Sequence, residues 1–224
     1  MPIAGTGMLL TSMDVDAADE PEFSRWYDRE HLEERVATDG FLEARRYVAH
    51  RGSPKNLFLY STATIDVLDS PAYRARLANP TERSRHNMAH FKNMIRVVAR
   101  ITVSRGKGRG SVLGIMRLRP SAGSEDELRA VLRSQLDPGE LDGIISMHLL
   151  ESDSRLSGPT SEVPVAVGAG ANDWFVLVDG TDIDAVSAML AALFGEYVPR
   201  PGTHISMGVY RLVWDLSKSD LSHS

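Results

Sequence analysis

Residues 23–32 gather the side chains in this sequence best suited to chemistry. An aromatic pair, Trp26 and Tyr27, is followed by the titratable pair Glu30 and His31. Residues three and four apart share one face of a helix, so all four side chains can face one groove between a helix and a sheet. We therefore expect a candidate site on this helix.

The working group of that site is His31, because the pKa of a free imidazole lies close to neutrality and suits proton transfer. Glu30 or Asp28 can orient the ring, and Tyr27 can donate a hydrogen bond to a developing oxyanion. We therefore expect His31, Tyr27 and Glu30 to be the catalytic residues. The alternative is an ordinary amphipathic helix, with its aromatic residues in the core and His31 satisfied at the groove edge.

A second cluster, residues 83–91, contains His86 and His90 four positions apart, the spacing of paired metal ligands on a helix. The zinc-protease pattern also needs Glu directly after the first His, and Asn87 stands there. This segment is basic and polar, as is typical of a solvated face. We expect no metal site, and a pocket-lining role for Asn87, His90 and Phe91.

Two adjacent arginines, Arg45 and Arg46, occupy a predicted strand and must point to opposite faces. One of them should face the groove or the interior of a barrel, where it can bind a carboxylate or a phenolate. The groove strands also offer Tyr60. The expected ligand-binding residues are Trp26, Arg46, Tyr60, Asn87, His90 and Phe91.

The elements that position these residues follow the order β-α-β-β-α-β in the first half. Acidic residues and Pro21 open the first helix, and Asp39-Gly40 ends it. The remaining expected elements are strands at 7–12, 42–50, 56–64 and 95–103 and helices at 67–77 and 81–94.

The second half repeats this order with weaker signals. Strands are expected at 112–118, 144–151, 174–179 and 206–216. A capping-box pattern at Ser124–Glu127 opens a helix that ends at Leu136, and residues 183–194 form an amphipathic helix. The long, Gly-rich loop 154–172 suits a lid, an interaction loop or plain mobility.

The repeated order predicts an α+β fold made of two ferredoxin-like repeats. A four-stranded sheet with both helices on one face must bury its other face, most simply against a second copy. We therefore expect the two repeats to close one intramolecular barrel. Residues 1–104 would form the repeat with the pocket, 105–111 a linker, 112–217 a degenerate repeat and 218–224 a tail.

Composition excludes several classes of function. The 224 residues include no Cys, which rules out disulfides, thiolate metal sites and cysteine nucleophiles. A net charge of −5 makes general affinity for nucleic acid or anionic membranes unfavourable. Without a long apolar run or a basic start followed by an apolar core, the sequence predicts a cytoplasmic protein with no membrane span.

The first half resembles the EthD-like family of dimeric α+β barrel proteins. The resemblance rests on Glu22-Phe23, Trp26-Tyr27, Glu30-His31-Leu32, Gly40-Phe41 and the strand Ala44-Arg45-Arg46-Tyr47, and it covers about residues 5–104. It continues at 57–60 and 68–73. Such proteins include cofactor-independent monooxygenases, cyclases, lactone isomerases, dehydratases and haem-binding relatives. The resemblance implies a groove between helices and sheet, with His31 as a pocket residue.

We therefore expect a small-molecule enzyme without an obligatory cofactor, acting on an apolar or aromatic metabolite with a polar handle. The reaction stays open between isomerisation, dehydration, cyclisation and oxygenation. The alternative is a non-catalytic ligand-binding or scaffold protein, with a groove filled by its own side chains. A haem-binding variant, with His31, His86 or His90 as axial ligand, is less favoured. The partner expected is a small molecule. A fused pair of repeats already covers its own sheets, so the oligomeric state stays open between a monomer and a homodimer.

Overall fold

The computed structural model describes residues 3–158, 170–195 and 201–223. Its first half consists of strands and helices in the expected order, with the first helix divided into three segments. The bounds are β1 (Gly7–Asp14), α1 (Glu20–Trp26), the π-helical turn η1 (Tyr27–His31), α2 (Leu32–Ala37), β2 (Phe41–Arg51), β3 (Asn56–Thr62), the 3₁₀ turn η2 (Ile65–Asp69), α3 (Pro71–Ala78), α4 (Glu82–Met88) and β4 (Lys92–Gly106).

The second half has the same order with single helices. Its elements are β5 (Val112–Pro120), α5 (Glu125–Gln135), β6 (Ile144–Ser152), β7 (Trp174–Gly180), α6 (Ile183–Phe194), β8 (Gly202–Ser217) and the 3₁₀ segment η3 (Lys218–His223).

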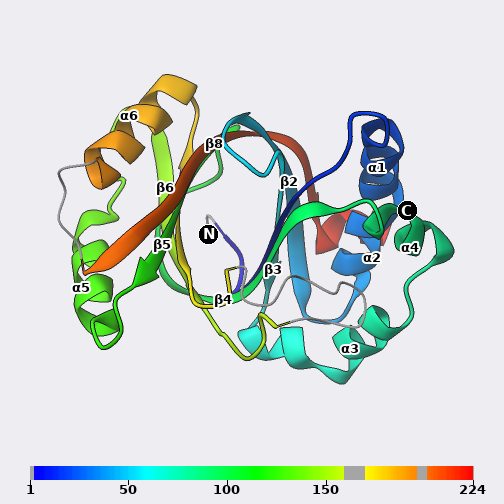
Figure 1. The fold of residues 1–224 in the computed structure, drawn as a ribbon. Coiled ribbons are helices and arrows are strands. Elements are labelled where there is room, and N and C mark those ends of the chain that lie inside the picture. The colour runs from blue at the N-terminus through cyan, green and yellow to red at the C-terminus, as the bar shows by residue number, and fades with distance from the viewer. Residues whose placement is uncertain (1–2, 159–169, 196–200, 224) are drawn as a thin grey trace.

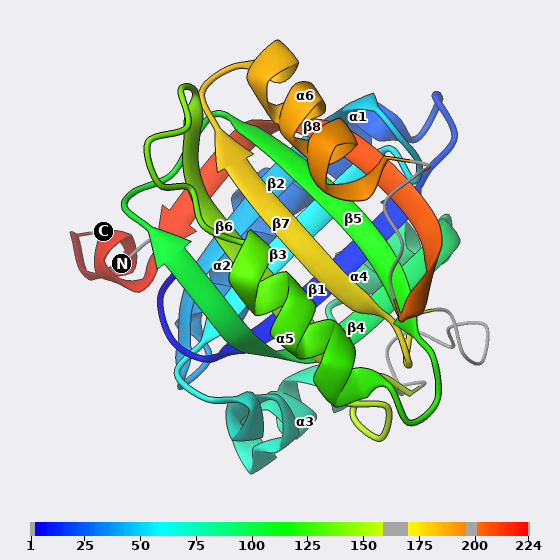
Figure 2. The ribbon, with the colours of Figure 1, turned by 90° about the vertical axis from the view of Figure 1, so that its left-hand side faces the viewer.

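The eight strands form one closed barrel in the order β1-β3-β2-β8-β5-β7-β6-β4. Each half supplies a four-stranded antiparallel sheet, and the seams are the antiparallel pairs β2–β8 and β4–β6. Figure 1 shows the two sheets facing each other, with α5 and α6 outside one and α1 to α4 outside the other. Figure 2, which looks onto β7, shows α5 and α6 lying across the second sheet. The predicted α+β barrel is therefore confirmed.

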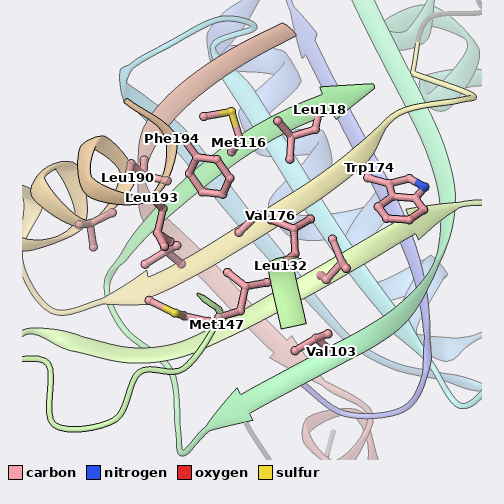
Figure 3. Close-up of a cluster of buried hydrophobic side chains, with 14 of the residues drawn as sticks. Val103, Met116, Leu118, Leu132, Met147, Trp174, Val176, Leu190, Leu193 and Phe194 are labelled. Carbon is pink, nitrogen blue, oxygen red and sulfur yellow. The ribbon is translucent and has the colours of Figure 1, made fainter. Parts of the chain in front are cut away.

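Three apolar clusters hold this architecture together. One fills the barrel, where Ile3 lies among strand residues of both halves such as Leu59 and Leu177. The other two lie between each sheet and its own helices. Figure 3 shows the cluster of the second half, which lies between its sheet and the helices α5 and α6. Side chains from these helices pack onto the strands there: Leu132, Leu190, Leu193 and Phe194. Aliphatic side chains thus dominate the face that corresponds to the candidate site.

The barrel interior also holds a buried polar group from both halves. Arg45 donates to Glu43 Oε1 at 2.9 Å and lies 3.8 Å from Asp179 Oδ2. His148, fully buried on β6, lies 3.7 Å from the same carboxylate. Of the two adjacent arginines, Arg45 is therefore the one that points into the barrel.

Four local expectations need correction or fall outside the described residues. The single helix expected at 67–77 is divided into η2 and α3, because Ser70 is extended and its side chain caps α3 by accepting from Tyr73 N. The helix expected at 81–94 ends at Met88. Strand β4 begins at Lys92, and its second residue, Asn93, has a positive φ of 52°. Ser124 caps α5 by position but makes no side-chain capping hydrogen bond. Most of the loop 154–172, residues 159–169, lies outside the described residues.

Candidate functional site

The site begins with an irregularity in the first helix. Between α1 and α2 the backbone widens into a π-helical turn, in which the Leu32 N–H donates to the Tyr27 carbonyl five residues earlier. Such turns are rare and are frequently found at functional sites. Here Tyr27 and His31 are both buried against the sheet, whereas Glu30 is partly exposed.

Tyr27 and His31 meet the sheet at a small cavity in the first half. Its volume is about 30 Å³, enough for one or two water molecules. The walls come from β1, β3, β4, the first helix and the α3–α4 region: Leu9, Thr11, Tyr27, His31, Arg35, Tyr60, Tyr73, Met88, Phe91, Met94 and Arg96. The sequence had grouped four of these residues as site candidates, namely Tyr27, His31, Tyr60 and Phe91.

His31 is buried beside the cavity, and its ring contacts two aromatic side chains. Its ring lies 4.4 Å from the Trp26 ring and 4.9 Å from the Tyr27 ring, measured between centroids. Nδ1 has no hydrogen-bond partner within the described part of the chain. Burial, followed by the positive charge of Arg35, holds the pKa of His31 well below its ordinary value of 6.5. The imidazole is therefore neutral at physiological pH and can accept a proton.

Two tyrosines line the cavity together with His31. The Tyr27 ring stacks on Phe58 with centroids 3.8 Å apart, which fixes its orientation. Burial, with a further contribution from the neighbouring Tyr27, raises the pKa of Tyr60 well above its ordinary value of 10.0. Tyr60 therefore keeps its proton and can serve as a hydrogen-bond donor but not as a base.

The cavity also contains polar residues that sequence reasoning missed. Arg35 and Arg96 are both buried, and Thr11 Oγ1 has no hydrogen-bond partner among the described residues. Arg35 is four residues after His31, so helical spacing offered a signal. Arg96 and Thr11 face each other on β4 and β1, and this pairing depends on sheet register that local sequence does not reveal.

Five of the expected site residues do not line the cavity. Trp26 is fully buried in the core and donates from Nε1 to Ser84 Oγ at 3.2 Å. Glu30 Oε1 accepts a hydrogen bond from Thr81 Oγ1 at 2.7 Å. The other three residues contact the protein outside the cavity. Arg46 donates to Asp28 and Ser24, Asn87 donates to the Arg83 carbonyl, and His90 lies next to Asp19.

Glu30 therefore does not orient His31. The wide turn at residues 27–31 changes the angle between successive side chains, so the spacing expected for a regular helix fails at this position. Both oxygens of Glu30 are engaged toward α4, where Arg83 lies 3.2 Å from Oε2.

In the arrangement that the structure shows, the space beside His31 is too small for a haem, and the described histidines form no metal cluster. His31 borders about 30 Å³ of space, far below the hundreds of cubic ångströms of a typical cofactor pocket. His86 is exposed, and His90 Nδ1 lies 3.2 Å from Asp19 Oδ2. Within residues 3–158, 170–195 and 201–223, no three His, Asp or Glu side chains are grouped as metal ligands.

Two larger hollows differ from this cavity in that no buried, unpartnered polar atoms of the described residues line them. They measure about 370 and 360 Å³ and lie on the surface of the second half and between α2 and α3. None of the buried side-chain atoms that lack a partner in the described structure belongs to their walls. The small cavity, by contrast, is bordered by such atoms from His31 and Thr11.

Comparison with solved structures identifies the architecture. An anthrone oxidase-like protein superposes with a TM-score of 0.61 at 10% identity, covering 95% of this chain and 93% of its own. A candidate monooxygenase from Fusobacterium nucleatum gives 0.59 at 9% identity, covering 96% and 95%. A candidate chlorite dismutase gives 0.56 at 13% identity, covering 97% and 98%. The chain has the dimeric α+β barrel fold.

At these identities the likeness establishes the fold of the barrel alone. No sequence-family model matches the chain, and no curated protein is similar to it in sequence. The more specific resemblance to EthD-like proteins therefore stays a prediction. Within the described part of this α+β barrel, no helix is long and apolar enough to cross a membrane.

Proposed function

We propose that this protein is a small-molecule enzyme in which neutral His31 removes a proton from an apolar or aromatic substrate. The observation that carries the proposal is the buried imidazole beside the cavity, whose Nδ1 lacks a hydrogen-bond partner in the described structure. Burial also lowers the pKa of His31, which keeps the ring neutral. Such a group is destabilised unless it meets a ligand or water, and its unpartnered ring nitrogen is free to accept a proton from a substrate bound beside it.

The neighbouring side chains suit the anion that proton removal would create. Tyr60 stays protonated and can donate a hydrogen bond to a developing oxyanion. Arg35, which also borders the cavity, supplies positive charge close to His31. Stabilised carbanions and phenolates lead to isomerisation, dehydration, cyclisation or reaction with oxygen, so one machinery serves all four reactions.

Substrate entry requires movement of the outer wall. A cavity of about 30 Å³ does not hold an aromatic molecule. Met88, Phe91 and Met94 form its partly exposed side, and none of them belongs to the regular part of a helix interior. Methionine is unbranched and adapts its shape readily. We therefore assign these three side chains to the gate.

The proposal includes the finer expectations from the sequence. The chain would be an EthD-like protein made of residues 1–104 and 112–217, joined by 105–111, with the working site in the first repeat only and no obligatory cofactor. The repeated element order supports this division. The aliphatic packing under α5 and α6 supports a structural role for the second repeat.

The alternative is a non-catalytic binding or scaffold protein. Two observations favour it: Trp26 is packed in the core, and side chains of the protein fill most of the groove. The two functions differ in whether His31 exchanges protons with a bound ligand.

Anthrone is a suitable test substrate because one structural neighbour is anthrone oxidase-like. His31 would take a proton from its methylene carbon, and the resulting anion would form a C–O bond to O₂. Return of the proton gives a hydroperoxide, which breaks its O–O bond and loses one water to give anthraquinone, with O₂ as the oxidant. We expect the protein to accelerate deuterium exchange at this carbon, followed by O₂ uptake. His31→Gln should abolish both and leave Tm within a few degrees. Equal rates in the variant, or binding without exchange, would favour the scaffold alternative.

A further inference from the structure

The cavity is unusual in its charge. Two buried arginines, Arg35 and Arg96, lie in its walls, and no Asp or Glu is among the described residues that line it. His31 is neutral and adds no negative charge. The walls of this space are therefore net positive.

Arg96 is the more informative of the two cations. It is 4% exposed, and its NH1 group donates to the carbonyl oxygens of Leu156 at 2.8 Å and Gly158 at 3.4 Å. Within the described residues it makes no salt bridge. A buried guanidinium without an anion is costly, since carbonyl dipoles replace only part of its hydration. Its remaining donors form a planar fork that matches a carboxylate.

The second half of the chain fixes the orientation of Arg96. Leu156 and Gly158 belong to the segment that follows β6. Ser157 anchors this segment to β4, because its Oγ accepts from Val98 N at 2.9 Å and donates to Val98 O at 3.1 Å. The guanidinium is therefore held in place before any ligand arrives.

Other groups complete a binding site for an oxyanion. Thr11 faces Arg96 across the β1–β4 pair, and its hydroxyl has no partner in the described structure. Leu9, Met94 and Phe91 provide apolar surface beside these polar atoms. The arrangement suits a charged head attached to an apolar body.

We infer that the cavity binds its substrate by a carboxylate, with Arg96 as the principal anchor. The inference rests on the proposed function only in using the same cavity. It deepens the description of the substrate from a molecule with a polar handle to an organic acid with a small apolar or aromatic group.

Matched pairs of acids and neutral amides test this inference. Formate, acetate and benzoate would each be compared with formamide, acetamide and benzamide by calorimetric titration at pH 7.5. We expect each acid to bind at least about tenfold more tightly than its amide, as a charge-assisted hydrogen bond requires. Formate and acetate are the smallest of these acids and require the least movement of the gate.

Arg96→Met should weaken acid binding by about tenfold or more and leave amide binding unchanged. Arg96→Lys, which retains charge but loses the fork, should lie in between. The matched control is Arg100→Met, because Arg100 lies on the same strand but is exposed. If Arg96→Met fails to fold, the comparison of acids with amides in the native protein still tests whether the cavity prefers a carboxylate.

Three results would overturn the inference: no binding by any acid, equal binding of acids and amides, or acid binding that survives Arg96→Met. Its failure is distinguishable from failure of the proposed function. Acid binding without deuterium exchange, measured both on anthrone and on phenylacetate as a carboxylate-bearing carbon acid, would refute the enzyme and support the anion site. Exchange on anthrone without preference for acids retains the enzyme and removes the anion site.

Discussion

Replacing His31 by Phe should make the protein less sensitive to mild acid. In the native state burial keeps the imidazole neutral, with its pKa well below 6.5. In the unfolded chain the same group titrates near its ordinary value. Between these two values the unfolded state binds more protons than the native state, so stability falls as the pH falls.

The size of the effect follows from the unfolded state. Between pH 7.0 and pH 5.5, protonation of a free imidazole stabilises the unfolded chain by about 1.3 kcal/mol, provided that native His31 remains neutral. The wild type should lose up to this amount more than His31→Phe. At pH 7.0 the variant should be at least as stable, because Nδ1 forgoes no hydrogen bond and the adjacent cavity can take the extra volume.

Urea unfolding followed by tryptophan fluorescence measures this difference. For a slope of about 2.5 kcal/mol per molar urea, 1.3 kcal/mol is a shift of about 0.5 M in the midpoint. Comparing both proteins at both pH values cancels groups that titrate alike in each. His204→Gln, at an exposed position, is the control and should behave as the wild type. Equal loss of stability in the wild type and His31→Phe would refute the neutral, buried state of His31.

Two further variants separate structural residues from site residues. Arg46→Met should reduce stability by about 1–3 kcal/mol, because Asp28 loses its partner at 2.6 Å, yet benzoate affinity should stay within about twofold. If calorimetry showed a large loss of benzoate affinity, Arg46 would have to be a ligand-binding residue after all. Phe91→Ala should open the gate and improve benzoate binding relative to formate, at a cost of about 1–2 kcal/mol for a partly exposed ring. An unchanged ratio of the two dissociation constants would place the entrance elsewhere.

The sequence predicted the fold well because each element carried a local signal. Apolar or β-branched runs marked all eight strands, and the helix expected at 183–194 has the bounds Ile183–Phe194. The closed barrel followed from the need to bury the second face of each sheet. Errors occurred at 81–94, where Met88, Phe91 and Met94 are spaced like a helical stripe. These three side chains instead converge on the cavity from a helix end, a turn and a strand.

The site was less predictable because its geometry depends on non-local contacts. His31 and Tyr27 could be identified from residue type and spacing, and both border the cavity. Glu30 could not be placed, because a π-helical turn interrupts the regular spacing. Arg96 gave no local signal: its importance depends on burial and on the carbonyls of Leu156 and Gly158, about sixty residues away.

The contact between Arg96 and the segment after β6 does not weaken when the protein is diluted. Both partners belong to one polypeptide, so the contact forms at an effective concentration that does not depend on how much protein is present. A barrel assembled from two separate chains would lose the corresponding contact whenever the chains dissociated. In this chain the guanidinium keeps its carbonyl partners in a single molecule, and its orientation therefore persists at the lowest cellular abundance.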